Sequence, residues 1–212
     1  MERPKIATAA MERSDRYLRG FVEALHLCPF ARRCREDGKL HRRVLLPEDD
    51  ALAAVREIEA LPAESIEVAL LIFPQSPVGS PEAARAFEAF AAGLREQISQ
   101  RSSDRSQTFY CVAFHPDFPR DLADAHRAVP FIRRSPDPTV QLVRASVLRA
   151  VRGDNNGERY VDPSKLTLEQ MMALTVPVST SDRIAESNLE TLTREGPDKV
   201  ESLLASLRPS YR

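Results

Sequence analysis

The sequence predicts an α/β fold: a three-layer α/β/α sandwich with a small, mainly parallel sheet and a helical C-terminal extension. Three observations predict this class. Short, almost wholly apolar runs alternate with amphipathic helical segments, as in βαβ units. Hydrophobic residues make up 42% of the chain and charged residues 29%, which is typical of a globular protein. The 212 residues are enough for one domain with a substantial core. A two-layer α+β fold of the split βαβ type is the alternative.

Three segments have the character of buried strands: LHRRVLLP (40–47), SIEVALLIFP (65–74) and TFYCVAF (108–114). The second and third are nearly continuous apolar runs, which indicates burial on both faces of a sheet. Right-handed crossovers then place the two linking helices on one face, and the first helix and the later ones cover the other face.

The helix before the first strand carries an apolar stripe with helical spacing, formed by Leu18, Phe21, Val22 and Leu25. Cys28 falls on nearly the same face, and Pro29 ends the helix. The two linking helices are expected at 48–61 and 80–99. The first has acidic residues in its opening turn, and the second begins with Ser80 as N-cap and Pro81 as the first helical residue.

The chain beyond the third strand is predicted to be mostly helical. A segment rich in proline and arginine (119–139) leads into a helix at 139–151, whose core-facing residues are Val140, Val143, Val147, Leu148 and Val151. A short helix is expected at 166–174, and a pair of helices within 181–207 is interrupted by Gly196-Pro197. We therefore expect one domain over 1–212, with an α/β core at 1–152 and a helical extension at 160–212.

Composition argues against several classes of function. With 30 basic and 31 acidic side chains the formal net charge is −1, so there is no electrostatic footprint for nucleic acid. No apolar run approaches the ~20 residues that span a membrane, and the first 20 residues lack the apolar stretch of a secretory signal. A cytoplasmic location is expected. Three cysteines predict neither a disulfide framework nor zinc, and seven scattered glycines form no phosphate-binding loop.

The candidate catalytic residues follow the third strand, in FHPDFP (114–119). His115 and Asp117 lie where open parallel sheets bind ligands, beyond the carboxyl ends of strands. A carboxylate beside an imidazole fixes its tautomer and raises its basicity, so the pair suits general acid–base catalysis. Cys28 is the candidate nucleophile. The alternatives are a strand-end histidine bonded to backbone, a turn-forming Asp117 and a Cys28 packed in the core.

An anion-binding clamp is predicted just upstream of the 139–151 helix. Arg133, Arg134 and Ser135 stand there, and guanidinium groups near free amides at a helix N-terminus attract anions. Gln75, at the end of the second strand, is the fourth candidate for substrate binding. The alternative is a set of salt bridges that lock the long loop, such as Arg134 with Asp117. The spacing of histidines and acids matches no established metal signature, so no metal site is predicted, and no cofactor is indicated.

Three stretches in this order, LHLCPFA (25–31), FHPDF (114–118) and RSPDPTVQLVRASV (134–147), resemble the family catalogued as domain of unknown function 1415. A weaker fourth stretch is IAESNLETL (184–192). The resemblance spans most of the chain and implies a self-contained fold, but no activity. The sequence departs from the family pattern at three positions beside the expected site, where Arg133 replaces an asparagine, Asp137 an aromatic residue and Gln141 a histidine.

Two functions follow from these residues. In the first, the protein is an enzyme acting on a small anionic molecule, with His115 and Asp117 as the acid–base pair and Arg134 with Ser135 as the anion clamp. In the second, it is a non-catalytic binding or structural module in which the same cluster only rigidifies loops. Geometry discriminates between them, since the enzyme requires His115 and Arg134 to face one solvent-reachable cavity.

Overall fold

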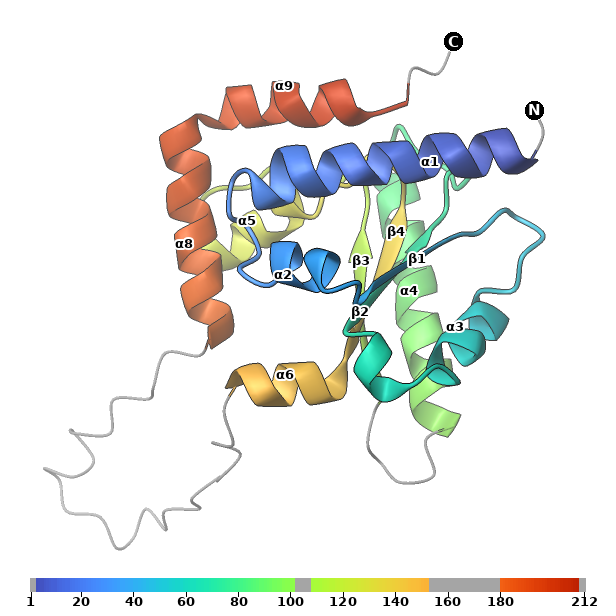
Figure 1. The fold of residues 1–212 in the computed structure, drawn as a ribbon. Helices are drawn as coiled ribbons and strands as arrows, with labels where there is room; N and C mark the ends of the chain where they lie inside the picture. Colours follow the sequence, from blue (N-terminus) through green and yellow to red (C-terminus); the bar gives the residue numbers. More distant parts are fainter. Residues whose placement is uncertain (1–2, 102–107, 153–179, 210–212) are drawn as a thin grey trace, which may run out of the picture.

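The computed structural model describes residues 3–101, 108–152 and 180–209 (Figure 1). They form a mixed α/β fold around a four-stranded open sheet with the strand order β1-β2-β4-β3. The strands are β1 (Leu40–Val44), β2 (Val68–Ile72), β3 (Phe109–Phe114) and β4 (Thr139–Arg144). β1 and β2 are parallel, whereas β4 runs antiparallel between β2 and β3.

The expected helix at 139–151 is wrong for its first half. Residues 139–144 form β4, and the helix α6 (Ala145–Arg152) begins only after it. Val140 and Leu142 alternate with Thr139 and Gln141, which is a period of two, and hydrogen bonds to β2 and β3 on both sides satisfy the backbone. This strand also makes the sheet mixed rather than mainly parallel. It separates β2 from β3, so the β2–α4–β3 unit has the split βαβ arrangement of the alternative prediction.

Most other elements lie close to where the sequence predicts them. The helices are α1 (Arg3–Tyr17) with its π-helical continuation η1 (Leu18–Glu23), α2 (Ala31–Glu36), α3 (Ala51–Glu59), α4 (Pro81–Arg101), α5 (Ala125–Ile132), α8 (Thr180–Glu195) and α9 (Pro197–Leu207), with a short 3-10 turn η2 (Ala63–Ser65). The predicted cap of α4 is confirmed, because the Ser80 hydroxyl accepts from the backbone of Ala83 at 3.2 Å. The break at Gly196-Pro197 separates α8 from α9. The expected helix at 166–174 lies outside the described residues.

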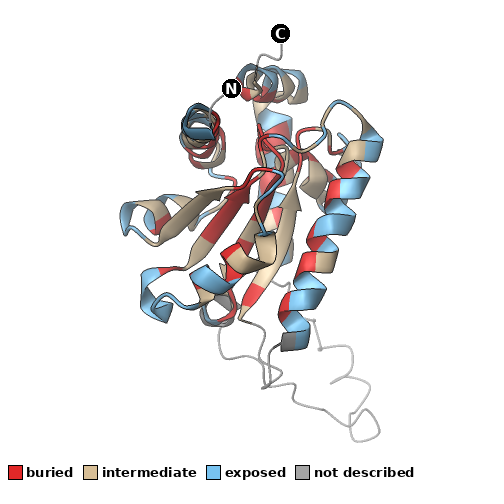
Figure 2. Ribbon diagram, turned by 90° about the vertical axis from the view of Figure 1, so that its right-hand side faces the viewer, coloured by how far each residue is buried: buried red, intermediate tan, exposed pale blue. Residues whose placement is uncertain are grey.

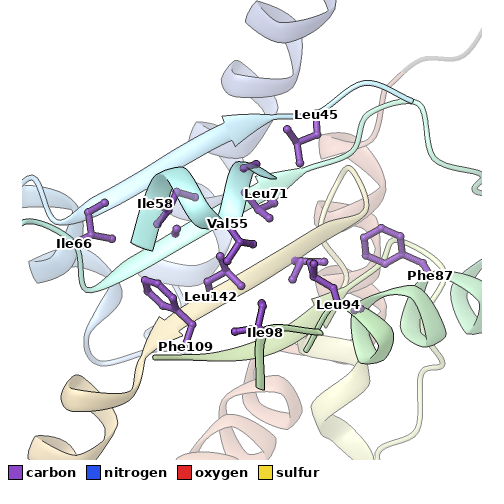
Figure 3. Packing of buried hydrophobic residues seen from close by; sticks show 14 residues of the cluster. Leu45, Val55, Ile58, Ile66, Leu71, Phe87, Leu94, Ile98, Phe109 and Leu142 are labelled. Atoms are coloured by element: carbon purple, nitrogen blue, oxygen red, sulfur yellow. The ribbon is translucent and has the colours of Figure 1, made fainter. Parts of the chain in front are cut away.

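One face of the sheet is closed by α3 and α4. The apolar cluster there joins side chains from both helices to the strands, including Val55, Ile58, Leu71, Phe87, Leu94, Phe109 and Leu142 (Figure 3). Buried residues are concentrated in the inner strands β2 and β4 and on the sides of the helices that face the sheet, whereas the edge strands β1 and β3 are mostly of intermediate exposure (Figure 2). Because nonpolar area removed from water stabilises by roughly 25 cal/mol per Å², this dry cluster is a main source of stability.

The other face of the sheet is covered differently. Ala10 of α1 and Leu18 of η1 pack on Leu70 and Ile72 of β2. Beyond them α5, α8 and α9 form a separate apolar cluster with Tyr17 and the segment that follows it. In Figure 1, α9 lies alongside α1 and α8 stands at one side of the sheet, with α2 and α5 between. Helices therefore pack on both faces, but those on the second face leave a hollow between themselves and the sheet.

Candidate functional site

His115 is fully buried, at 0% exposure, and both ring nitrogens are bonded. Nδ1 accepts from the backbone N–H of Asp117 at 3.2 Å, so Nε2 carries the proton and donates to the carbonyl of Pro77 at 3.1 Å. The ring lies between those of Phe87 and Phe118, with centroids 5.7 and 6.0 Å away. Burial lowers the pKa of His115, although the Pro77 carbonyl and Asp117 oppose the shift, so the imidazole is held neutral.

Asp117 and Arg134 do not meet each other. Asp117 accepts from the backbone of Gly79 at 2.5 Å and from Arg208 at 3.2 Å. Arg134 donates to the carbonyl of Phe118 and to Glu201, each at 2.5 Å, and lies over the ring of Phe131. The expected ion pair between Arg134 and Asp117 is therefore wrong. Both residues instead attach the 115–118 turn to α9 and its C-terminal end, and neither His115 nor Arg134 lines either of two hollows, of about 650 and 760 Å³, that the described residues form.

Instead, a cavity of about 650 Å³ lies between the second face of the sheet and the helices α1, α2, α5 and α8. Its floor includes Leu70 and Gln141, which are paired neighbours on β2 and β4. Three of the predicted site residues line it: Cys28, Arg133 and Ser135. Gln75 lines a different hollow of about 760 Å³ between α3 and α4, and Arg134 lines neither, so the four predicted substrate-binding residues lie in three places.

Arg133, directly after α5, is the distinctive charge of the cavity wall. Within the described part of the chain its guanidinium makes no ion pair and no hydrogen bond, and Glu88 and Tyr17 act on it only through space. Burial lowers the pKa of the Arg133 guanidinium. The acidic groups Asp137 and Glu67 on the same wall are already neutralised by Arg13 and Lys39. A guanidinium in this position offers planar donors to an anion.

Comparison with known protein families assigns the chain to one of them. The family model described as "Protein of unknown function (DUF1415)" matches residues 9–173. The chain belongs to this family. No curated protein and no solved structure matches it. Two of the stretches that carry the family resemblance, 25–31 and 134–147, contribute side chains to the cavity wall, whereas 114–118 forms the closed turn around His115.

Three neutral polar side chains of the cavity were missed by the sequence analysis as site residues. Gln141, Asn188 and Ser14 line it, and none of them has a side-chain hydrogen-bond partner among the described residues. Asn188 is only 5% exposed and Ser14 only 7%. A signal for Asn188 was present, because it occupies the buried stripe of α8 between Ala185 and Leu192, where an apolar residue is the norm. Gln141 was hidden by the incorrect helix.

Cys28 and Ser135 have restricted chemistry in this arrangement. Burial raises the pKa of the Cys28 thiol, and the backbone N–H groups of Phe30 and Ala31 oppose the shift only in part. The thiol is therefore protonated at neutral pH, which argues against an activated nucleophile. The Ser135 hydroxyl donates to the carbonyl of Asp137 at 2.6 Å, so its one proton is already used. Of the predicted clamp, Arg133 is the residue with unused donors at the cavity.

The described residues contain neither a metal-binding cluster nor a membrane-spanning helix. No group of three or more histidine, cysteine or acidic side chains there could hold a metal ion. In the same residues, no helix combines the length and the apolar character needed to cross a membrane.

Proposed function

We propose that this protein binds a small anionic molecule in the cavity on the second face of the sheet, with Arg133 as the anion contact. The observation that carries the proposal is an arginine that lines a cavity, is half-buried and has no counter-ion in the described residues. Buried charges are normally paired, and a charge left without a partner at a cavity is satisfied when a ligand of opposite charge binds.

The remaining wall suggests the body of the ligand. The volume of about 650 Å³ lies within the range of small-molecule sites, roughly 300–1,000 Å³. Much of the surface is apolar, with contributions from Leu18, Val22, Leu70, Ile72 and Phe114. An apolar surface with one fixed charge complements an amphipathic acid. The proposed ligand is therefore a carboxylate with an apolar body rather than a compact polyanion.

His115 and Asp117 have no direct part in this proposal. Both nitrogens of His115 are bonded to backbone, and the cavity is lined without it. In the proposal they rigidify the turn that leads towards Arg133, since the backbone N–H of His115 donates to the Arg133 carbonyl at 3.0 Å. The proposal therefore gives His115 and Asp117 the structural role of the non-catalytic hypothesis. It keeps the anion site of the enzyme hypothesis but locates it at the cavity on the second face of the sheet.

The test is a calorimetric titration with octanoate and with octanamide, which has the same body but no charge. We expect octanoate to bind, and Arg133→Met to weaken it by about 10- to 100-fold, because a charge-assisted hydrogen bond contributes about 1.5–3 kcal/mol. Arg127→Met is the matched control, because Arg127 belongs to α5, which Arg133 directly follows, but its side chain is exposed and pairs with Asp121. Octanamide should bind the wild type and Arg133→Met with the same affinity, because it carries no charge.

Alkylation supplies an independent readout of occupancy. Cys28 lines the cavity, whereas Cys111 packs against the cluster on the opposite face of the sheet. Octanoate should slow the reaction of iodoacetamide with Cys28 and leave Cys111 unchanged, as measured by peptide mass spectrometry. Equal octanoate affinity in the wild type and in Arg133→Met, or no saturable binding at all, would overturn the proposal.

A further inference from the structure

The floor of the cavity contains an amide where an apolar side chain would complete the surface. On the sheet, Gln141 is in register with Leu70 on one side and Val112 on the other. The next cavity-lining residue along β4 is Val143. No described residue hydrogen-bonds to the Gln141 side chain. Gln141 is half-buried, and an amide that no protein group satisfies on the wall of a cavity is available to a polar group of a ligand.

Asn188 repeats this pattern from a different element. It is 5% exposed, it lines the same cavity from α8, and its side chain has no hydrogen-bond partner in the described segments. Its buried neighbours on α8 are the apolar Ala185 and Leu192 and the polar Thr191. The Thr191 hydroxyl accepts from Arg194, so Asn188 is the buried polar side chain of α8 without a partner among the described residues. Two unpartnered amides, from a strand and from a helix, thus face one cavity. Ser14 of α1 adds an unpartnered hydroxyl.

The chemistry of these groups differs from that of Arg133. A guanidinium only donates hydrogen bonds, whereas each carboxamide both donates and accepts. Amides therefore complement a group that can do both, such as a hydroxyl or another amide, and they have no charge with which to attract a second anion. We infer that the ligand is a carboxylate carrying a second, uncharged hydrogen-bonding group on its apolar body, namely a hydroxy acid or an N-acyl amino acid, read by Gln141 and Asn188. This inference rests on the proposed anion site.

The experiment compares three probes of similar length: octanoate, 3-hydroxyoctanoate and N-hexanoylglycine. Calorimetry on the wild type should show at least one of the two polar acids binding 10-fold or more tightly than octanoate. Sites that hydrogen-bond a ligand group discriminate strongly against analogues that lack it. Gln141→Leu and Asn188→Leu should each reduce this preference to about threefold or less, while octanoate itself binds as well as before or better.

The controls separate recognition from folding. Gln97→Leu changes an exposed glutamine on α4 that lines the other hollow, and it should leave all three affinities unchanged. Thermal melting should show Gln141→Leu folded and at least as stable as the wild type, because its amide has no partner to lose. Asn188→Ala replaces Asn188→Leu if the larger side chain disturbs the packing of α8.

The outcomes distinguish this inference from the function on which it rests. If octanoate binds in an Arg133-dependent way and neither polar acid binds more tightly, the second polar group is wrong and the anion site stands. If the preference exists but survives both leucine substitutions, its assignment to Gln141 and Asn188 is overturned. If none of the three acids depends on Arg133, the anion site fails and this inference fails with it.

Discussion

The two faces of the sheet show how one short strand serves two purposes. Along β4, Val140 and Leu142 point into the cluster under α3 and α4 and are fully buried. Gln141 and Val143 point the other way and line the cavity. Beside β4 the first face is packed with apolar side chains (Figure 3), and the hollow of about 760 Å³ on that face lies between α3, α4 and the residues that follow β1 and β2. The second face keeps its hollow over β2 and β4 themselves, with polar side chains that have no partner among the described residues.

This difference separates stability from recognition. A filled face gains from every methyl group that is removed from water, and it tolerates few changes. A face with unpartnered amides and an unpaired guanidinium gives up part of that gain, which proteins do where a ligand completes the contacts. The turn around His115 is closely packed and hydrogen-bonded, although histidine and aspartate are residues that often act in catalysis. Each prediction below tests this division.

The largest effect is expected for Leu142→Ala. Leu142 is completely buried in the filled cluster, so its truncation leaves a void between β4 and the helices. We expect the free energy of unfolding to fall by about 2–5 kcal/mol, as for other fully buried leucines. Urea denaturation of the wild type and the variant measures this loss.

Val143→Ala is the matched control, because it removes methyl groups from the next residue of the same strand but on the cavity face. There we expect a loss of about 1 kcal/mol or less, since the side chain already borders open space. Comparable losses in the two variants would contradict the division between a filled and an unfilled face.

The next largest effect is expected for His115→Ala. The substitution removes a ring packed between Phe87 and Phe118, and leaves the Pro77 carbonyl and the Asp117 N–H without partners. We expect a loss of about 2–4 kcal/mol in the free energy of unfolding, because cavity and hydrogen-bond terms act together. A catalytic residue seldom carries stability of this size. Urea denaturation provides the measurement.

His126→Ala is the control for that experiment. His126 is 75% exposed at the opening side of the cavity, and its truncation should change the free energy of unfolding by no more than about 0.5 kcal/mol. A His115→Ala protein as stable as the wild type would return His115 to the list of candidate catalytic residues.

Local patterns in the sequence were sufficient for most of the framework. Nearly continuous apolar runs predicted β2 and β3, a short segment ended by Pro47 predicted β1, Ser80 and Pro81 predicted the start of α4, and Gly196-Pro197 predicted the break between α8 and α9. They failed at β4, because valines at 140, 143 and 147 also fit a helical spacing. They failed at α5 as well, where Pro130 argues against a helix although Asp124 caps it. In both cases contacts with distant segments outweigh the local signal.

The site was less predictable, for a related reason. The rule that ligands bind beyond strand ends directed attention to His115, but the partners of that turn come from the far C-terminus, in Arg208 and Glu201. No local pattern shows that these side chains will close it. The expectation that the arginines at 133 and 134 bind an anion was more useful. Arg133 does line a cavity, whereas Arg134 next to it forms an ion pair with Glu201. Which neighbour stays unpaired depends on packing and not on sequence spacing.

The smallest effect concerns the pH dependence of stability, and it isolates His115. The folded state lowers the pKa of this buried imidazole, so below about pH 6.5 the unfolded chain binds a proton that the folded chain does not. The stabilisation is complete above that pH and is lost as the pH falls towards the folded-state pKa. The slope should not exceed about 1.4 kcal/mol per pH unit. Between about pH 7.5 and 5 the carboxylates of Glu23 and Glu67 contribute little, because their ion pairs lower their pKa values. Burial raises the pKa of Asp137, which acts in the opposite direction, so the slope is assigned by comparison with a His115 variant that keeps Asp137.

The comparison that assigns the slope to His115 is between urea denaturation of the wild type, His115→Gln and His126→Ala. The His115→Gln protein has no imidazole at the buried position, so its stability should vary less with pH than that of the wild type, although its absolute stability is lower. His126→Ala should retain the slope, since it leaves the buried imidazole of His115 in place. Parallel pH profiles for the wild type and His115→Gln would show that the turn admits the charged ring. In that case water would have to reach the His115 ring in the folded protein. The contrast between the closed turn and the open cavity would then no longer hold.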